Sequence, residues 1–119
     1  MGSAYNFNDI KASKVEEAAV IYGINRAQMA TLLGVSEKTY YNLMKSETLD
    51  KNQGDRFTFI QNILEEGVQT FGDSSNLKDW LNTEQPTMGG QKPVVMMSTI
   101  NGAQDVLAAI TRIKHGIFV

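Results

Sequence analysis

The sequence contains no cysteine, only one histidine and only two prolines in 119 residues. The lack of cysteine excludes a disulfide framework and thiolate chemistry, and this suits a cytoplasmic protein. No apolar run approaches the roughly 20 residues that a membrane helix needs. Residues 1–10 lack the basic and apolar regions of a signal peptide. We therefore expect a cytoplasmic chain that has no membrane partner.

An excess of charge of one sign is also missing. The formal net charge is −2, whereas a strong non-specific binder of nucleic acid usually has a basic excess. Between residues 26 and 56, five basic side chains (Lys and Arg) face four acidic ones, so the segment has a net charge of +1. Any binding of DNA by one protomer is therefore expected to be weak.

The groups that catalysis needs are absent from the sequence as well. It has no cluster of metal-ligand residues, no Gly-x-Ser-x-Gly elbow and no phosphate-binding loop. The lone histidine, His115, has no carboxylate or nucleophile at a recognisable spacing, and a position in the last turn of a helix suits its partial charge. We expect a protein that is not an enzyme and that binds no cofactor and no metal.

A helix-turn-helix pattern is the most informative feature present. Ala30 is small and lies four residues before Gly34, where two helices would cross closely. Gly34 can adopt the positive φ that ends the first helix, and Val35 fills the corner. Ser36 can then cap the second helix. In DNA-binding proteins with this pattern, the second helix enters the major groove.

The predicted second helix presents polar side chains outward, whereas Tyr40 falls on its inward face. Lysines and hydroxyl groups suit contacts to phosphate, and tyrosine can contact phosphate or a thymine methyl group. The alternative is a solvated face in a protein that keeps the motif only as a packing unit. The candidate DNA-binding residues are Ser36, Lys38, Thr39, Tyr41 and Lys45.

The rest of the chain also predicts helices, and no run of alternating apolar and polar residues indicates a sheet. The fold is therefore expected to be all-α. The predicted helices start at Asn8 or Asp9 (to Tyr22), Arg26 (to Leu33, capped by Asn25), Ser36 (to Lys45), Asp50 or Asn52 (to Phe71), Ser74 or Ser75, Val94 (to Ser98) and Asn101 (to Gly116).

Two segments outside these helices have a function that the pattern of residues alone does not determine. Thr83 to Lys92 contains Pro86, Gly89 and Gly90, and we expect an ordered loop there. Ile117, Phe118 and Val119 form an apolar tail beyond a helix stop. The tail either folds back on the last helix or docks into a partner. We favour docking, in which the terminal carboxylate would mimic an anionic part of the partner's substrate.

The order of motifs along the chain resembles the antitoxins of the Xre/MbcA/ParS type, which pair with RES-domain toxins in bacterial toxin–antitoxin operons. The resemblance covers about three-quarters of the chain, and an ordered series of motifs is much more specific than a lone helix-turn-helix. One departure is that Tyr41, Asn42, Leu43 and Met44 stand where family members often have several arginines. The matching motifs are Leu33 to Tyr41, Leu49, Asp55-Arg56, Phe71-Gly72-Asp73, Trp80-Leu81, Pro86, Met88-Gly89-Gly90, Lys92-Pro93, Thr99, Gly102-Ala103, Val106, Ile113, His115-Gly116 and the final residue, Val119.

The resemblance implies an all-α homodimer that contacts its second copy through the long helix. Residues 1–72 would form an Xre-like helix-turn-helix half, and residues 73–119 a small helical toxin-binding half. The partner would be a RES-domain toxin that consumes NAD, and the antitoxin would occlude its active site. The complex would bind operator DNA more strongly than the antitoxin alone, because bridged dimers provide several weak DNA-binding units.

The resemblance also places toxin contacts in the second half of the chain, with Phe118 and Ile117 as apolar anchors. Two alternatives are a stand-alone helix-turn-helix regulator and a protein–protein adaptor with vestigial DNA binding. The predicted toxin-binding residues are Gly89, Gly90, Lys92, His115, Ile117, Phe118 and Val119.

Overall fold

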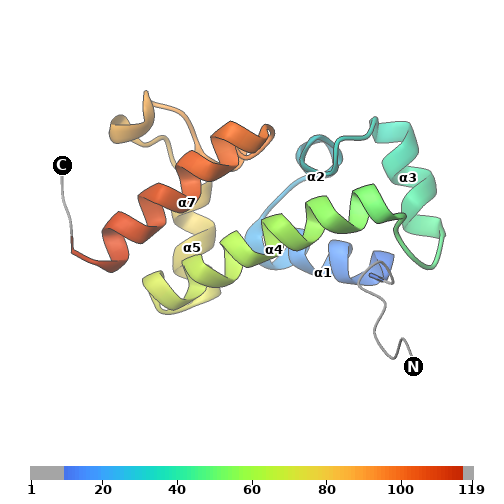
Figure 1. Ribbon diagram of the computed structural model, residues 1–119, viewed down its shortest axis with the longest axis horizontal. Helices are drawn as coiled ribbons and strands as arrows, with labels where there is room; N and C mark the ends of the chain where they lie inside the picture. Colours follow the sequence, from blue (N-terminus) through green and yellow to red (C-terminus); the bar gives the residue numbers. More distant parts are fainter. Residues whose placement is uncertain (1–9, 117–119) are drawn as a thin grey trace.

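Residues 10–116 are described in a computed structural model, and helices dominate them (Figure 1). The all-α prediction is confirmed, because this part of the chain has no β-strand and only two isolated β-bridges, Lys11 with Thr48 and Gln85 with Gln91. The helices are α1 (Ala12–Tyr22), α2 (Arg26–Leu33), α3 (Glu37–Lys45), α4 (Lys51–Phe71), α5 (Ser74–Leu81), the short 3-10 helix η1 (Pro86–Met88), α6 (Pro93–Met96) and α7 (Ile100–Lys114).

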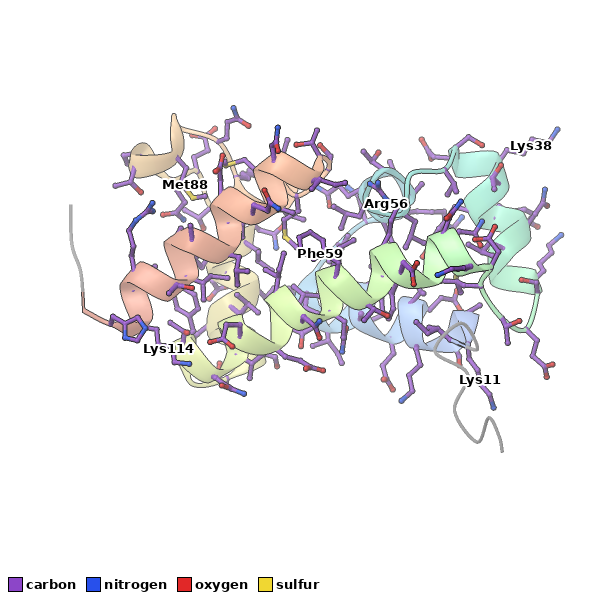
Figure 2. The ribbon with its side chains drawn as sticks, viewed as in Figure 1. Lys11, Lys38, Arg56, Phe59, Met88 and Lys114 are labelled. Atoms are coloured by element: carbon purple, nitrogen blue, oxygen red, sulfur yellow. The ribbon has the colours of Figure 1, made fainter. Side chains whose placement is uncertain are left out.

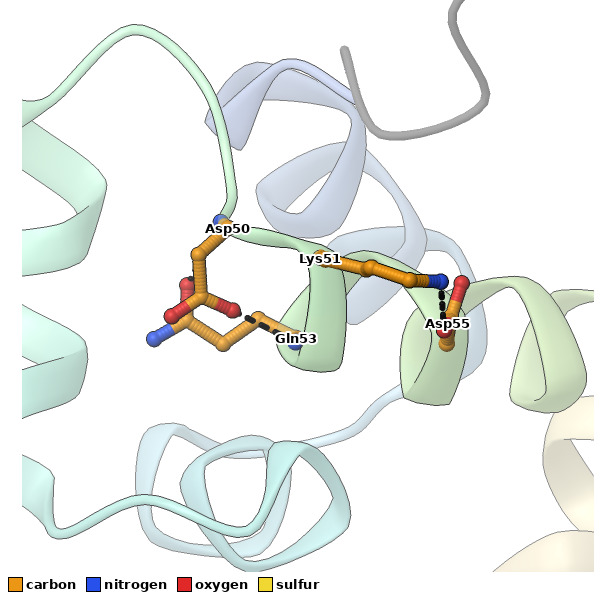
Figure 3. A network of polar contacts seen from close by, with 4 residues as sticks. All are labelled: Asp50, Lys51, Gln53 and Asp55. Carbon is orange, nitrogen blue, oxygen red and sulfur yellow. Dashed lines mark hydrogen bonds and ion pairs between the residues drawn. The ribbon is translucent and has the colours of Figure 1, made fainter.

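Three helix starts follow the capping residues predicted from the sequence. Asn25 caps α2, Ser36 caps α3 and Asp50 caps α4, each accepting a hydrogen bond from a backbone N–H three residues later. Figure 3 shows the start of α4, where the Gln53 N–H donates to the Asp50 carboxylate at 2.8 Å. Lys51 pairs with Asp55 at 3.1 Å in the first turn. These ends depend on neighbouring residues only, so local chemistry predicts them.

Three other starts differ from the prediction. The last helix is capped by Thr99 rather than Asn101, because the Thr99 hydroxyl accepts from the Gly102 N–H at 2.9 Å. Asp73 rather than Ser74 or Ser75 caps α5, since its carboxylate accepts from the Asn76 N–H. Both residues stand three positions before the N–H that they satisfy, which is the favoured geometry.

The first helix also starts later than predicted. Lys11 is extended and takes the N-cap position of α1 without a side-chain hydrogen bond. The backbone here pairs with a distant loop: the Ala12 N–H donates to Glu47, and the Leu49 N–H donates to Ile10. This pairing holds Ile10 and Lys11 out of the helix. The predicted caps at residues 8 and 9 lie outside the described residues.

The sixth helix spans Pro93–Met96 and ends before the predicted Ser98. The sequence also predicts Pro93 at the first helical position, and the structure confirms it. A further short helix, η1, was not predicted; it lies inside the expected loop. Both segments start at a proline, whose fixed φ favours the first position of a helix and whose missing N–H is not needed there.

The core forms around α4, which packs against α2, α5 and α7. Apolar residues recur along α4 at helical spacing. Phe57, Ile60, Ile63 and Leu64 are buried, whereas Val68 and Phe71 are half-buried. Gly67 lets α5 approach closely, since a Cβ at this position would lie 2.6 Å from Leu77 Cδ1. The close packing at Gly67 thus comes from the same chain.

Residues from both halves of the chain share this core. α1, α2 and α3 surround one end of α4, and α5, α6 and α7 surround the other end (Figure 1). The molecule is elongated, with extents of 45 × 35 × 24 Å. Met97 is buried, and Met96 and Trp80 are half-buried against this core. Within residues 10–116, none of the helices combines the length and apolar character that crossing a membrane requires.

Candidate functional site

The corner between α2 and α3 has the geometry of a helix-turn-helix. Gly34 ends α2 with φ = 76°, the left-handed conformation that glycine adopts without steric cost. The Val35 N–H then donates to the Ala30 carbonyl at 2.9 Å and closes the turn. Arg56 of α4 supports the corner, because its Nε donates to the Leu32 carbonyl at 3.0 Å. The second helix is thereby held at a defined angle to the rest of the molecule.

Two of the predicted DNA-binding side chains also serve the start of α3. The Ser36 hydroxyl accepts from the Thr39 N–H at 3.1 Å, and the same hydroxyl lies 3.0 Å from Thr39 Oγ1. Both side chains are exposed. Their structural role is capping, and their remaining capacity suits contact to a phosphate oxygen.

The exposed face of α3 carries a continuous polar stripe. Lys38, Tyr41, Asn42 and Lys45 recur at the spacing that lines one side of a helix, and all four are exposed. Lys45 Nζ lies 4.2 Å from the centre of the Tyr41 ring, a cation–π contact. In Figure 2, Lys38 points away from the body of the molecule. We define these four residues as the α3 stripe.

The opposite side of α3 anchors the helix in the core. Tyr40 is 4% exposed, as predicted from its inward position. Burial raises the pKa of the Tyr40 phenol, and the negative charge of Glu16 raises it further, while Arg26 lowers it. The helix therefore has one anchored face and one free face, which is the arrangement that insertion into a groove of DNA requires.

The connector between α5 and α6 is ordered, as expected. The Gln85 N–H donates to the Gln91 carbonyl at 3.0 Å, and the Gly90 N–H donates to the Gln85 carbonyl at 2.9 Å. Gly89 and Gly90 both have positive φ and are exposed. Lys92 follows them, exposed at the start of α6. These glycines shape the backbone and leave a bare, accessible surface around it.

The carboxyl end of α7 is basic. Arg112 and Lys114 lie in its last turn, and His115 is the exposed C-cap residue. Positive charge at this end favours the helix dipole. Lys114 also pairs with Glu66 of α4 at 2.8 Å, which ties the end of α7 to the long helix. The predicted contacts at residues 117–119 lie outside the described residues.

The predicted sites fall at two ends of the molecule. The connector and the end of α7 lie toward one end, and α3 lies at the other (Figure 1). Between them, an apolar groove of about 290 Å³ separates α4 from the start of α7, lined among others by Phe59, Met97 and Ile100. Sequence reasoning did not identify this groove, because its lining comes from segments that are far apart in the chain.

Asn42 was also missed as a functional candidate. The available signal was its position one turn from Lys38, on the same outward face. Within residues 10–116, no group of three or more His, Cys, Asp or Glu side chains is placed to hold a metal ion.

The fold as a whole matches known structures. It superimposes on one chain of the crystal structure of the M. tuberculosis MbcT–MbcA toxin–antitoxin complex with a TM-score of 0.59. The two chains are 19% identical, and the match covers 91% of this chain and 96% of the other. A search of curated protein sequences finds no significant match.

The helix-turn-helix and the appended helices define a two-part class of protein. Residues 11–59 match the antitoxin Xre-like helix-turn-helix domain. Residues 66–116 match the antitoxin Xre/MbcA/ParS C-terminal toxin-binding domain. The chain therefore belongs to the antitoxins of the Xre/MbcA/ParS type, as its order of motifs indicated.

Proposed function

We propose that this antitoxin neutralises a RES-domain, NAD-consuming toxin by occluding its active site, and that it represses its own operon through DNA binding. The observation that carries the proposal is the presence of a toxin-binding domain and a DNA-binding motif in one chain. The similar fold in the MbcT–MbcA complex adds support, since that structure is a toxin–antitoxin pair. Such a protein acts by binding and would need no cofactor.

The toxin would be held at the end of the molecule that carries the connector and the end of α7. Gly89, Gly90 and Lys92 offer exposed backbone and one positive charge, and His115 adds a second polar contact. Ile117 and Phe118 would then insert as apolar anchors, with Val119 beside them, because buried apolar anchors supply most of the affinity at an interface. Occlusion of this kind depends on shape and apolar contact more than on net charge.

The DNA would be held at the opposite end. Ser36, Lys38, Thr39, Tyr41 and Lys45 would contact mainly phosphates, and with only two lysines among them a single protomer would bind weakly. Binding would strengthen in the complex, where several copies engage the operator together. Because the two surfaces lie at different ends, one molecule can hold toxin and DNA at once (Figure 1).

Residues 1–72 would carry DNA binding and self-association, and residues 73–119 toxin binding. We propose a homodimer that forms through the long helix. The buried apolar stripe of α4 is already covered by α2, α5 and α7, so the second copy would contact its remaining faces. The pair would act in the cytoplasm, where both NAD and the operator are accessible.

The test is co-expression with the product of the adjacent reading frame. If the proposal holds, that neighbour arrests growth and depletes NAD when expressed alone, and it is harmless and co-purifies when this chain is present. A neighbour that is harmless alone and does not bind would contradict the antitoxin role. Salt-sensitive binding to the upstream DNA would then favour a stand-alone regulator, and no DNA binding would favour an adaptor.

A matched pair of variants locates the toxin surface. Removal of residues 117–119 should abolish neutralisation while the helical circular dichroism signal stays intact. The control is Val20→Ser, which changes a side chain of α1 that is 78% exposed and belongs to neither proposed surface. Equal neutralisation by both variants would contradict the anchoring role of the tail.

A further inference from the structure

The side chains on the free face of α3 differ in what they can recognise on DNA. At 3.6 residues per turn, the four residues of the α3 stripe fall within an arc of about 100°. Lys38 and Lys45 are point charges that donate only, and phosphate attracts them whatever the base sequence. The stripe has no arginine, the residue that most often recognises guanine through two hydrogen bonds.

The hydroxyl and aromatic groups of α3 are already engaged within the protein. Ser36 and Thr39 hydroxyls hold each other at the helix cap, at 3.0 Å. The Tyr41 ring carries Lys45 against one face, with 4.2 Å between Nζ and the ring centre. These contacts fix the positions of the groups, and they leave phosphate and apolar contacts as their main use.

Asn42 is different. It is exposed in the middle of the stripe, and no hydrogen bond joins its side chain to another described residue. Its amide presents a donor and an acceptor in one plane, and it is the one side chain of α3 that does so. This pair matches the N6 donor and N7 acceptor of adenine in the major groove, which asparagine binds through two hydrogen bonds.

We propose that Asn42 determines the sequence specificity of this antitoxin by recognising an adenine in the major groove of its operator. The inference rests on the proposed DNA binding and adds the residue and the base that select the site. The anchored face of α3 supports it, because Tyr40 is buried and fixes the rotation of the helix, so that Asn42 points outward at a constant position. Lys38 and Lys45 then set the register on the flanking phosphates.

Glu37 is the competing candidate for base recognition. It is exposed at the first position of α3, and a carboxylate can accept a hydrogen bond from N4 of cytosine. Its negative charge also favours the start of the helix, which explains its presence without any base. Recognition through Glu37 would select a C·G pair, whereas recognition through Asn42 selects an A·T pair, so the two are separable by experiment.

The experiment selects binding sites from a random duplex DNA library with the full-length chain at low salt. The variant is Asn42→Ala, and the matched control is Asn101→Ala, an exposed asparagine in the first turn of α7. The parent and the control should enrich a motif in which one adenine is preferred over guanine by about tenfold or more. Asn42→Ala should lose the preference at that position and keep the rest of the motif. Both variants should fold, because alanine favours a helix.

A modified base tests the contact itself. Replacement of that adenine by 7-deazaadenine removes the N7 acceptor, and it should weaken binding of the parent by about fivefold or more while Asn42→Ala is insensitive to it. An unchanged adenine preference in Asn42→Ala, or a C·G preference lost in Glu37→Ala instead, would overturn the assignment to Asn42 while leaving DNA binding intact. If the parent protein shows no salt-sensitive binding to DNA, the proposed DNA binding itself is wrong, and the assignment to Asn42 is overturned with it.

Discussion

At the residue scale, Gly102 controls the corner between α6 and α7. It lies in the first turn of α7, where its N–H binds the Thr99 hydroxyl. A Cβ at this position would overlap the Met96 carbonyl oxygen, a backbone atom that cannot rotate away. Only glycine fits here, and this could not be predicted from the sequence, because the constraint depends on where the backbone of Met96 lies.

We expect Gly102→Ala to destabilise the protein by about 2–3 kcal/mol, as overpacking of a tight contact does. The direction of the change in stability is informative, because replacing glycine by alanine at an unobstructed helical position would stabilise the protein by up to about 1 kcal/mol. Gly67→Ala is the comparison: its Cβ would meet the Leu77 side chain, which can move, so we expect a smaller loss. Urea unfolding measures the loss of stability in both variants. An equal loss, or a larger loss in Gly67→Ala, would show that the Met96 carbonyl does not restrict position 102 as proposed.

The buried phenol of Tyr40 predicts a loss of stability in alkali. Because burial and Glu16 raise its pKa in the folded state above the usual 10.0, folding favours the neutral phenol. The stabilisation is complete below about pH 10 and is lost as the pH rises through the higher folded-state pKa. Tyr40→Phe removes this titration, so its stability should decline less steeply than that of the parent above about pH 10.

Melting temperatures across the alkaline range provide the measurement. Tyr41→Phe is the control, since this tyrosine lies on the exposed face of the same helix. It should leave the alkaline decline of the parent in place. Parallel curves for the parent and Tyr40→Phe would show that ionisation of Tyr40 does not contribute.

At the element scale, Arg56 joins α4 to the end of α2. Its hydrogen bond to Leu32 spans 24 positions in the sequence, and its guanidinium packs against Gly34 at the turn. In Figure 2, Arg56 lies where α4 passes α2. The angle between α3 and α4 therefore depends partly on one side chain outside the helix-turn-helix.

We expect Arg56→Ala to lower the free energy of unfolding by about 1–3 kcal/mol, because it leaves a partly buried carbonyl without its charged donor. It should also weaken DNA binding, since α3 is held less firmly, while binding to the toxin is unchanged. For DNA binding, the charge-matched control is Arg112→Ala, an exposed arginine on α7. Equal DNA affinity for Arg56→Ala and the parent would contradict the positioning role.

The elements also show which parts of the fold the sequence could predict. The caps at Asn25, Ser36 and Asp50 were predictable, because each depends on a side chain and an N–H three residues apart. The late start of α1 was not, because it depends on backbone pairing between Ile10 and Leu49, which are distant in sequence. Thr99 and Asn101 were both competent caps by residue type, and in the structure it is the Thr99 hydroxyl that accepts from the N–H three residues later.

For the candidate site, the sequence predicted the corner, the cap and the outward face of α3, because helical spacing alone orients them. It could not predict the engagement of Tyr41 with Lys45, or the support from Arg56, since these depend on rotamers and on tertiary contact. The contacts of the candidate residues with DNA and toxin stay predictions. A single chain shows which side chains are presented, and the partners determine which of them are used.

At the scale of the whole molecule, the two candidate surfaces stand at different ends of an elongated body joined by one continuous core. This separation predicts that the two proposed functions can be lost independently. Lys38→Ala with Lys45→Ala should remove two phosphate contacts, reducing the slope of binding against salt by about 2. The same double variant should neutralise the toxin as the parent does.

The reciprocal variant lacks residues 117–119. It should bind operator DNA with the affinity of the isolated antitoxin and fail to protect cells from the toxin. It should also lose the increase in DNA affinity that the toxin confers, because that increase depends on bridging of several copies. Salt titrations of DNA binding, with and without toxin, and growth assays measure all three. If the lysine variant lost protection as well, the two ends would have to be coupled through α4, and the two surfaces would not be independent.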